Sequence, residues 1–263
     1  MSSSPPEPRR GAGAALAGID VAILAGGLGT RLRGAIGEMP KVLAPVAGKP
    51  FLDHLLAWLA GFGARRIVLC LGYRADMVVD HLRRTSTHGL EIVTSTEPRS
   101  LGTAGGLRLA VPELRSDTVL VMNGDTFVDA DLRAFVAEHR RKAAAASILT
   151  TIVPSMARYG RIEIDDDGRI HRFAEKDARD TGPGPINAGL YLFSRDWLAA
   201  LASGTAESLE RDVFAIAEAG SFRAISAGSA AFIDIGTPES LAAAGGVLSQ
   251  ALARVPHPNR DVA

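Results

Sequence analysis

Three glycines and two cations near the start of the chain have the types and spacing needed to bind phosphate groups. Gly26, Gly27 and Gly29 follow an apolar run, and Arg31 and Lys41 come shortly after them. Glycine leaves backbone N–H groups open to an anion because no Cβ stands in the way. A guanidinium binds phosphate as a planar fork and an ammonium as a point charge. The pattern predicts a nucleoside triphosphate site in which Arg31 and Lys41 fold over the same triphosphate.

The spacing of these glycines differs from the two familiar phosphate-binding loops. A Walker A loop needs lysine and a hydroxyl residue after its second glycine, whereas Gly34 is followed by Ala35 and Ile36. A dinucleotide-binding fingerprint needs a third glycine where this chain has Leu32. The loop is therefore not a P-loop, and a dinucleotide-dependent oxidoreductase is disfavoured. An ordinary strand-to-loop turn is the simpler interpretation of the glycines taken alone.

Two aspartates further along the chain have the setting of metal ligands. Asp125 follows the apolar run 118–122, so its carboxylate should emerge at the sheet edge that also carries the glycine loop. Asp234 lies between Ile233 and Ile235, where an unpaired carboxylate is costly to bury. Mg²⁺ takes one or two carboxylates together with substrate phosphates. We predict Mg²⁺ at Asp125 and Asp234, the alternative being that each aspartate caps a helix or a turn.

The amino-acid composition and net charge indicate which kinds of partner the protein binds. The chain has 263 residues, with 29 basic and 29 acidic side chains and a net charge of zero, so a nucleic-acid partner is not indicated. No apolar run has the length of a transmembrane helix. The single cysteine, Cys70, lies in an apolar run typical of a buried strand. We expect small-molecule substrates, no nucleic-acid or membrane partner and a cytoplasmic location, and a homo-oligomer stays open.

Apolar runs alternate with helical patterns along the segments that must position these residues. The predicted strands are 19–24, 66–71, 90–95, 118–122 and 147–153, and the predicted helices are 51–61, 75–84, 103–109 and 132–142. This order indicates right-handed crossovers and a three-layer α/β/α fold with a mostly parallel, Rossmann-like sheet. A hairpin over 161–173 predicts a small antiparallel insertion before a strand at 186–193.

The end of the chain is predicted to be helical. Helices at 207–219 and 237–252 close a single domain over 18–253, the second with Thr237 as its N-cap. Asp129 and Asp131 are expected to cap the helix that begins nearby. Segments 1–17 and 254–263 are predicted to be flexible tails, because most of the first, residues 1–13, is rich in Ser, Pro and Gly and lacks the apolar content to order itself, and residues 255–263 are judged alike.

The run from Leu24 to Pro50 resembles the signature of the sugar-1-phosphate nucleotidylyltransferases. It contains Gly-Gly-x-Gly-Thr-Arg-Leu, then Pro-Lys-x-Leu-x-Pro-Val and Gly-Lys-Pro. Further matches follow in order at 101–106, 123–125, 159–160, 175–176, 187–191, 208–212 and 232–237. Within the family, 43–52 most resembles the D-glycero-D-manno-heptose 1-phosphate guanylyltransferases. One departure is Gly34, where many members carry proline.

The resemblance implies the nucleotide-diphospho-sugar transferase fold, with the small antiparallel insertion on the sugar side. It also implies catalytic and binding functions for individual residues. Arg31, Lys41 and Asp125 would be catalytic, and Asp125 and Asp234 would hold Mg²⁺. The nucleotide would be bound by Leu24, Ala25, Gly26, Gly27, Gly29, Thr30, Glu97, Gly102, Thr103 and Gly124. The sugar phosphate would be bound by Gly160, Glu175, Lys176 and Asn187.

The resemblance also implies a reaction. A sugar 1-phosphate would attack the α-phosphorus of a nucleoside triphosphate in line, giving a nucleotide sugar for surface polysaccharide synthesis and pyrophosphate. Guanine offers two adjacent donors that the Glu97 carboxylate can accept, which favours GTP unless Glu97 simply points to solvent. The heptose-type segment favours D-glycero-D-manno-heptose 1-phosphate as the acceptor.

Other functions within the same family stay open. The enzyme could be a uridylyl- or thymidylyltransferase, or a guanylyltransferase that uses mannose 1-phosphate. A non-catalytic subunit that binds nucleotide sugars is a further alternative. The presence of Arg31, Lys41, Asp125 and Asp234 together argues against that alternative.

Overall fold

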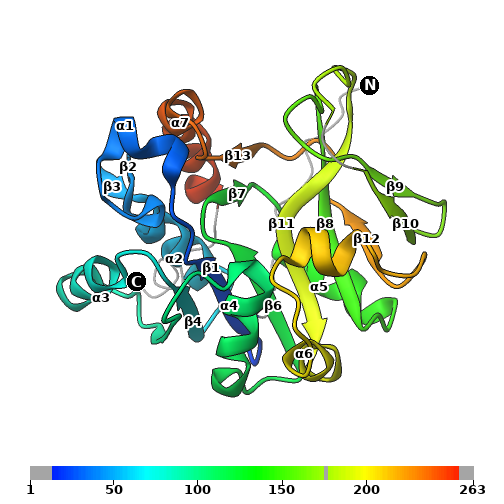
Figure 1. The fold of residues 1–263 in the computed structure, drawn as a ribbon, viewed down its shortest axis with the longest axis horizontal. Coiled ribbons are helices and arrows are strands. Elements are labelled where there is room, and N and C mark those ends of the chain that lie inside the picture. Colours follow the sequence, from blue (N-terminus) through cyan, green and yellow to red (C-terminus); the bar gives the residue numbers. More distant parts are fainter. Residues whose placement is uncertain (1–13, 175–176, 255–263) are drawn as a thin grey trace, which may run out of the picture.

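A seven-stranded sheet runs through the middle of the computed structural model, which describes residues 14–174 and 177–254 (Figure 1). Its strand order is β12-β8-β11-β6-β1-β4-β5. The strands are β1 (Asp20–Ala25), β4 (Arg66–Leu71), β5 (Glu91–Thr96), β6 (Thr118–Asn123), β8 (Ala146–Val153), β11 (Gly184–Ser194) and β12 (Arg223–Ser226). Only β11 runs antiparallel to its neighbours within this sheet. The predicted mostly parallel sheet is confirmed.

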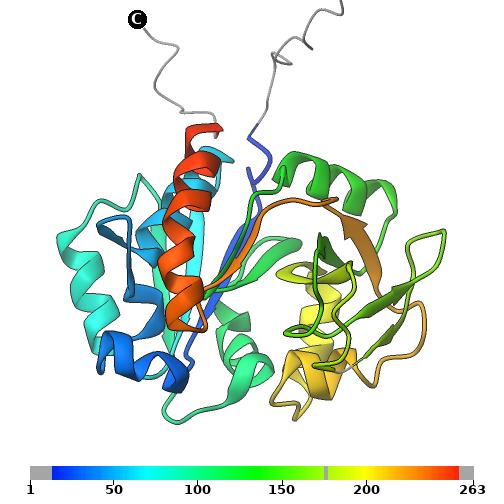
Figure 2. The same ribbon diagram turned by 90° about the horizontal axis from the view of Figure 1, so that it is seen from above.

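Apolar residues on both faces of the strands create two buried cores. In β1, Val21 and Ile23 belong to one core and Ala22 belongs to the other, as the alternation of side chains along a strand requires. The first core is covered by α2 (Phe51–Gly61), α3 (Ala75–Arg84), α5 (Leu132–Arg141) and α7 (Pro238–Arg254). The second is covered by α4 (Gly102–Ala110), α6 (Arg195–Ala202) and η4 (Leu209–Phe214). Figure 2 shows helices on both sides of the sheet, which confirms the three layers.

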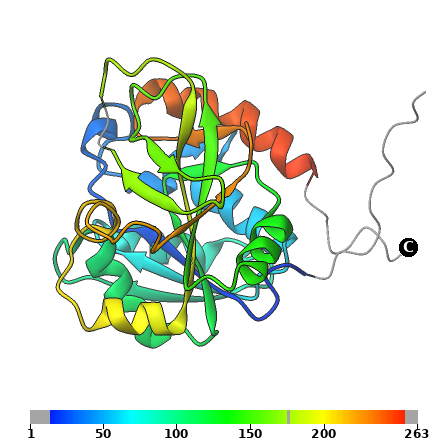
Figure 3. The same cartoon turned by 90° about the vertical axis from the view of Figure 1, so that its right-hand side faces the viewer.

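Three small two-stranded sheets stand beside the main one. They are β2 (Pro45–Val46) with β3 (Lys49–Pro50), β7 (Thr126–Val128) with β13 (Phe232–Asp234), and β9 (Ile162–Ile164) with β10 (Ile170–Phe173). The β9–β10 hairpin is the predicted antiparallel insertion, and Figure 3 shows it in front of the main sheet. The β7–β13 pair was not predicted. It joins the segment after β6 to the segment before α7.

Short helical turns complete the fold and carry several of the predicted site residues. They are η1 (Thr30–Leu32), α1 (Arg33–Ile36), η2 (Lys41–Leu43) and η3 (Val111–Glu113). Among the described residues, no helix combines the length and the apolar character that crossing a bilayer requires.

The predicted boundary of the N-terminal tail is wrong. Residues 14–17 belong to the folded domain, since Leu16 is fully buried and its N–H donates to the carbonyl of Phe62 at 3.0 Å. An apolar leucine that can reach a core orders the residues around it, even next to a glycine-rich stretch. The remainder of the two predicted tails, 1–13 and 255–263, lies outside the described residues.

Two predictions about helices also need correction. The predicted helix 207–219 is reduced to the π-helix η4. The Asp212 carboxylate accepts the N–H groups of Glu207 and Ser208 at its start, and residues 215–219 after it are not helical. Asp129 does not cap α5 and instead pairs with Arg254 at 2.6 Å.

The other predicted caps are present. Asp131 accepts the N–H of Arg133 at the start of α5, as predicted. Thr237 accepts the N–H of Ser240 in the first turn of α7, and Pro238 opens that helix.

Candidate active site

The glycine loop after β1 forms one wall of a cavity at the carboxyl ends of the parallel strands. We call it the glycine-loop cavity, and its volume is about 320 Å³. It is lined by Leu24, Ala25, Gly26, Gly27, Lys41, Val42, Cys70, Leu71, Ser95, Glu97, Ser100, Gly102, Thr103, Gly106, Leu109, Asn123, Gly124, Asp125 and Glu210. Most residues predicted to bind the nucleotide are in this lining. Gly29 and Thr30 are not part of the lining of this cavity.

Gly29 has a conformational role beside the cavity. It adopts φ +58° at the start of η1, and its Cα faces the Lys41 side chain, where an added Cβ would lie 3.5 Å from the Lys41 Cβ. The positive φ favours glycine and turns the chain so that η1 and η2 come together.

Two glycines make room for the Glu97 carboxylate inside this cavity. A Cβ at Gly72 would lie 2.3 Å from Glu97 Oε1 and 2.8 Å from the carbonyl oxygen of Gly26. A Cβ at Gly26 would lie 3.0 Å from the same Oε1. The Leu101 N–H donates to Glu97 Oε2 at 2.9 Å. Glu97 is therefore held in the cavity wall, and the alternative that it points to solvent is wrong.

Cys70 contributes an unreactive thiol to the same wall. Burial, and secondly the charge of Glu97, raise the pKa of the Cys70 thiol to about 12. The thiol stays protonated at neutral pH and acts as an apolar surface. The prediction of a buried strand cysteine is confirmed.

Lys41 joins the two predicted metal ligands. Its Nζ lies 2.6 Å from Asp125 Oδ2 and 3.4 Å from Asp234 Oδ1. Asp234 stands opposite Thr126 in the β7–β13 pair, and the Ile235 N–H donates to the Asp125 carbonyl at 3.0 Å. Backbone pairing thus brings together two carboxylates more than a hundred residues apart, next to the glycine loop as predicted.

A second and larger cavity, of about 940 Å³, opens on the other side of Asp125. We call it the arginine-lined cavity. Its charged lining residues are Arg31, Arg158, Arg161, Arg211, Asp125, Asp234 and Glu210. Its aromatic lining residues are Tyr159, Phe173, Phe214 and Phe232. The predicted sugar-phosphate residues Gly160 and Asn187 also line it, whereas Glu175 and Lys176 lie outside the described residues.

Arg31 departs from its predicted position. It lines the arginine-lined cavity rather than the glycine-loop cavity that contains Lys41. Leu32 is buried in the neighbouring position of η1, which leaves Arg31 exposed on the outer side of the turn. Arg31 and Lys41 therefore line different cavities, although Asp125 belongs to the lining of both.

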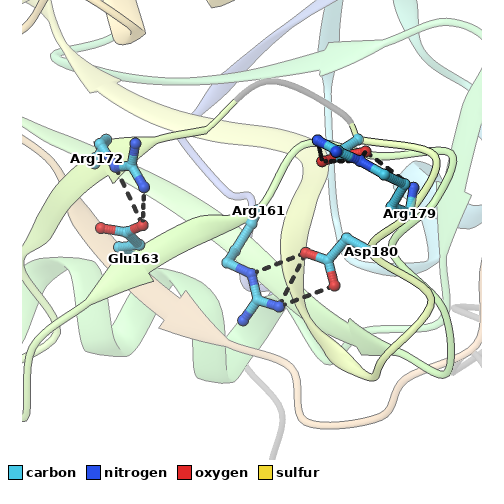
Figure 4. Close-up of polar contacts among 6 residues, drawn as sticks. Arg161, Glu163, Arg172, Arg179 and Asp180 are labelled. Atoms are coloured by element: carbon cyan, nitrogen blue, oxygen red, sulfur yellow. Dashed lines mark hydrogen bonds and ion pairs between the residues drawn. The ribbon is translucent and has the colours of Figure 1, made fainter.

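The arginines of the second region fall into two groups. Figure 4 shows a paired group near the β9–β10 hairpin, where Arg161 binds Asp180 with Nη2–Oδ2 at 2.9 Å and Arg172 binds Glu163. The hydrogen bond from Arg172 lowers the pKa of Glu163. By contrast, Arg31, Arg158 and Arg211 have no carboxylate within ion-pair distance in residues 14–174 and 177–254. This second group gives the cavity free positive charge for an anionic ligand.

The two cavities share a wall. Asn123, Asp125 and Glu210 line both of them. The Thr103 hydroxyl donates to Glu210 Oε2 at 3.0 Å and accepts the Leu209 N–H at 2.8 Å. These bonds tie α4, which lines the glycine-loop cavity, to η4, which lines the arginine-lined cavity.

Several residues that line the cavities or lie against their walls were not predicted. Gly72, which lies against Glu97, carries no motif of its own. Arg158 precedes the matched pair Tyr159-Gly160, and Glu210 and Phe232 belong to segments that matched the family signature without being given a role. Those segment matches were the signal that could have identified Glu210 and Phe232.

Comparison with known proteins gives a consistent group of relatives. The model of the family described as nucleotidyl transferase matches residues 21–250. A mannose-1-phosphate guanylyltransferase of Mycobacterium tuberculosis is 36% identical over 196 residues, which are 74% of this chain and 54% of that protein. The chain therefore spans about half the length of that relative.

Two shorter relatives match a larger part of their own length. A D-glycero-alpha-D-manno-heptose 1-phosphate guanylyltransferase of Aneurinibacillus thermoaerophilus is 33% identical over 67% of this chain and 75% of that protein. The crystal structure of HddC from Yersinia pseudotuberculosis complexed with GMP-PN has a TM-score of 0.77 and 33% identity, covering 87% of this chain and 98% of that one.

Proposed function

The chain belongs to the nucleotidyl transferase family, and from this we propose that it transfers a nucleoside monophosphate from a nucleoside triphosphate to a sugar 1-phosphate. One observation carries the proposal. The glycine-loop cavity and the arginine-lined cavity meet at Asp125, beside Lys41 and Asp234. A donor in the first cavity and an acceptor in the second would have their reacting phosphates at this shared wall.

The proposed reaction is a direct displacement at phosphorus. An oxygen of the sugar 1-phosphate forms a bond to the α-phosphorus, and the bond from that phosphorus to the pyrophosphate oxygen breaks. The two substrates repel each other because both are anionic, so positioning and charge neutralisation are the main tasks of the protein. Lys41 is assigned to the triphosphate. Arg31, on the arginine-lined side, is assigned to the phosphates at the junction.

Mg²⁺ is proposed as the cofactor, and the residues present fit it. Asp125 and Asp234 direct carboxylate oxygens at one cation, the Lys41 ammonium, and carboxylates with substrate phosphates are the ligands that Mg²⁺ prefers. When bound, Mg²⁺ would neutralise phosphate charge as the pyrophosphate leaves. In the described parts of the chain, no cluster of three or more metal-binding side chains offers a competing site.

GTP is the proposed donor. Support comes from the relatives named guanylyltransferases and from the related HddC structure with GMP-PN. Glu97 adds a physical argument, because its carboxylate is held in the cavity wall, where it can accept hydrogen bonds from guanine. Leu109 and Cys70 supply apolar surface in the same cavity for the base.

D-glycero-D-manno-heptose 1-phosphate is the proposed acceptor, and mannose 1-phosphate is the second candidate. The heptose enzyme is favoured by the match to the Aneurinibacillus heptose 1-phosphate guanylyltransferase, which covers 75% of that protein, and by the segment 43–52. The mannose enzyme is favoured by the higher identity to the mycobacterial protein. Gly160, Asn187 and the aromatic residues of the arginine-lined cavity would contact the sugar. Glu175 is still proposed to accept hydrogen bonds from sugar hydroxyls, and Lys176 to bind the phosphate.

A substrate panel tests both assignments. GTP, UTP, dTTP and ATP are each combined with heptose, mannose and glucose 1-phosphates, and pyrophosphate release is measured. We expect the highest kcat/KM for GTP with heptose 1-phosphate. Faster turnover of UTP with glucose 1-phosphate would reject the donor and the acceptor, while no pyrophosphate with any pair would reject the transferase itself.

A further inference from the structure

We propose that Lys41 acts as a placeholder cation, which occupies the gap between Asp125 and Asp234 until a divalent metal ion and the nucleotide displace it. This inference rests on the proposed function, because it takes the two aspartates as the metal ligands. It adds a second role to Lys41. In the free protein the lysine competes with the metal, and in the complex it binds the triphosphate.

The contacts of Lys41 carry the first step of the argument. Its ammonium bridges both carboxylates, at 2.6 Å from Asp125 and 3.4 Å from Asp234. The Lys41 side chain is only 13% exposed, whereas those of Asp125 and Asp234 are 40% and 21% exposed. A cation at ion-pair distance from two partly buried carboxylates occupies the region where a metal bound to the same two oxygens would sit.

The two carboxylates do not depend on Lys41 to stay together. The Ile235 N–H donates to the Asp125 carbonyl at 3.0 Å, and Asp234 is paired with Thr126 across the β7–β13 sheet. A Cβ at Gly236 would lie 2.7 Å from Asp234 Oδ1, so glycine leaves room for that carboxylate. Removing the lysine charge should therefore leave a preformed pair of metal ligands with no cation between them.

The backbone of Lys41 is held in place, but its side chain can adopt a second position. Val42 and Leu43 are buried next to it in η2, and the Ala44 N–H donates to the Lys41 carbonyl at 3.0 Å. Lys41 also lines the glycine-loop cavity together with Gly26 and Gly27. Rotation of its flexible stem can thus turn the ammonium from the carboxylates toward phosphates in that cavity.

Two positive charges cannot share this gap without strong repulsion. A divalent ion alone must break both ion pairs of Lys41, so metal binding to the free protein should be weak. A nucleotide that offers phosphate oxygens to Lys41 removes this cost. Metal and nucleotide should then strengthen each other's binding, a reciprocity that linkage requires.

The test measures Mn²⁺ binding to the nucleotide-free protein by electron paramagnetic resonance. Lys41→Met is expected to bind Mn²⁺ about tenfold or more tightly than the wild type, because a unit charge at ion-pair distance has been removed. Lys41→Arg keeps the charge and should bind as weakly as the wild type. Arg31→Met is the matched control, since it removes a nearby cation that touches neither aspartate, and it should change affinity less than Lys41→Met.

A second set of variants separates this inference from the proposed function. Lys41→Met/Asp125→Asn and Lys41→Met/Asp234→Asn should lose the tight Mn²⁺ site. If Lys41→Met binds Mn²⁺ no more tightly than the wild type, the placeholder role is wrong even where the metal assists the reaction. If the tight site survives both aspartate changes, the metal ligands of the proposed function are wrong as well. Lys41→Gln and far-UV circular dichroism show that the result does not depend on one misfolded variant.

Discussion

The glycine-loop cavity and the arginine-lined cavity are built in different ways. The first is lined by backbone and small residues at the carboxyl ends of β1, β4 and β6, and glycines at 26 and 72 fit closely around Glu97. The second is three times larger in volume, about 940 Å³ against 320 Å³, and is lined by long arginines and aromatic rings. A close-fitting backbone suits a constant polyphosphate, while long side chains can be replaced without altering the sheet. We infer that donor binding is fixed by the fold and acceptor choice by side chains.

The largest effects on turnover are expected from Asp125 in the shared wall and from Lys41 beside it, where the two cavities meet. Lys41→Ala and Asp125→Ala should each lower kcat by about 100-fold or more, the usual cost of losing a group that stabilises developing charge. Unfolding by urea should shift by less than about 2 kcal/mol, because neither change creates a core cavity. Pyrophosphate release at saturating substrate measures the loss.

Asp129→Ala provides the control for this experiment. Asp129 follows β7, the strand that begins after Asp125, pairs with Arg254 and belongs to the lining of neither cavity. The turnover of the Asp129→Ala variant should match that of the wild type. Near-normal pyrophosphate release by Lys41→Ala or Asp125→Ala would contradict their assignment.

Gly72→Ala should damage the glycine-loop cavity alone. The added methyl would lie 2.3 Å from Glu97 Oε1 and 2.8 Å from a backbone oxygen, so the carboxylate must move. We expect the KM for GTP to rise by about tenfold, because the displaced carboxylate would lose more than one hydrogen bond to the base. The KM for the sugar 1-phosphate should stay nearly unchanged. Steady-state kinetics with each substrate varied in turn gives both values.

Gly34→Ala is the matched glycine control. A Cβ at Gly34 meets no atom within 4 Å, so this change should leave both KM values as they are. An equal rise of the two KM values in Gly72→Ala would show that the cavities are not independent in the way we infer.

Thr103→Val tests the connection between the two cavities. It removes the hydroxyl that bonds Glu210 and the Leu209 N–H, while keeping a side chain of similar shape. We expect both KM values to rise by roughly three- to tenfold, since each lost hydrogen bond is worth about 1 kcal/mol. Thr103→Ser keeps the hydroxyl and should restore wild-type values. A change confined to one substrate would limit Thr103 to one cavity.

The smallest effect concerns Cys70. Burial first, and then Glu97, raise the pKa of its thiol to about 12, so at pH 8 the folded protein holds almost no thiolate. Thiol-specific reagents should react with it only after unfolding in urea, because the thiolate is the reactive form. Ser100→Cys places a second, exposed thiol in the same cavity and should react at once. Rapid labelling of Cys70 in the wild type would contradict a closely packed cavity wall.

The sequence predicts the glycine-loop cavity better than the arginine-lined cavity, and the reason is physical. Gly26, Gly27, Gly124 and Asp125 directly follow strands whose apolar patterns are plain, so their common position follows from parallel pairing. Phe232 and Arg211 come from separate segments, and only tertiary packing brings them to one cavity. Their residue types carry no signal of that position, and only the family match of the segments 208–212 and 232–237 pointed to them.

Two individual residues illustrate where sequence reasoning fails. Arg31 follows the glycine loop, but burial of the adjacent Leu32 in η1 turns it toward the other cavity. Asp212 lies in a segment with a helical pattern, but its carboxylate accepts the N–H groups of Glu207 and Ser208, so these two residues lie before the helix and not in it. In both cases a local pattern is overridden by a contact that composition does not reveal.

One measurement tests the central claim, that the protein transfers the guanylyl group of GTP to a sugar 1-phosphate. GTP labelled with ³²P at its α-phosphate is incubated with heptose 1-phosphate, Mg²⁺ and the protein, and the products are separated by chromatography. The account predicts that the label enters a guanosine diphosphate sugar, in an amount equal to the unlabelled pyrophosphate released. Label that remains in GTP, or that leaves only as GMP or GDP, would contradict it.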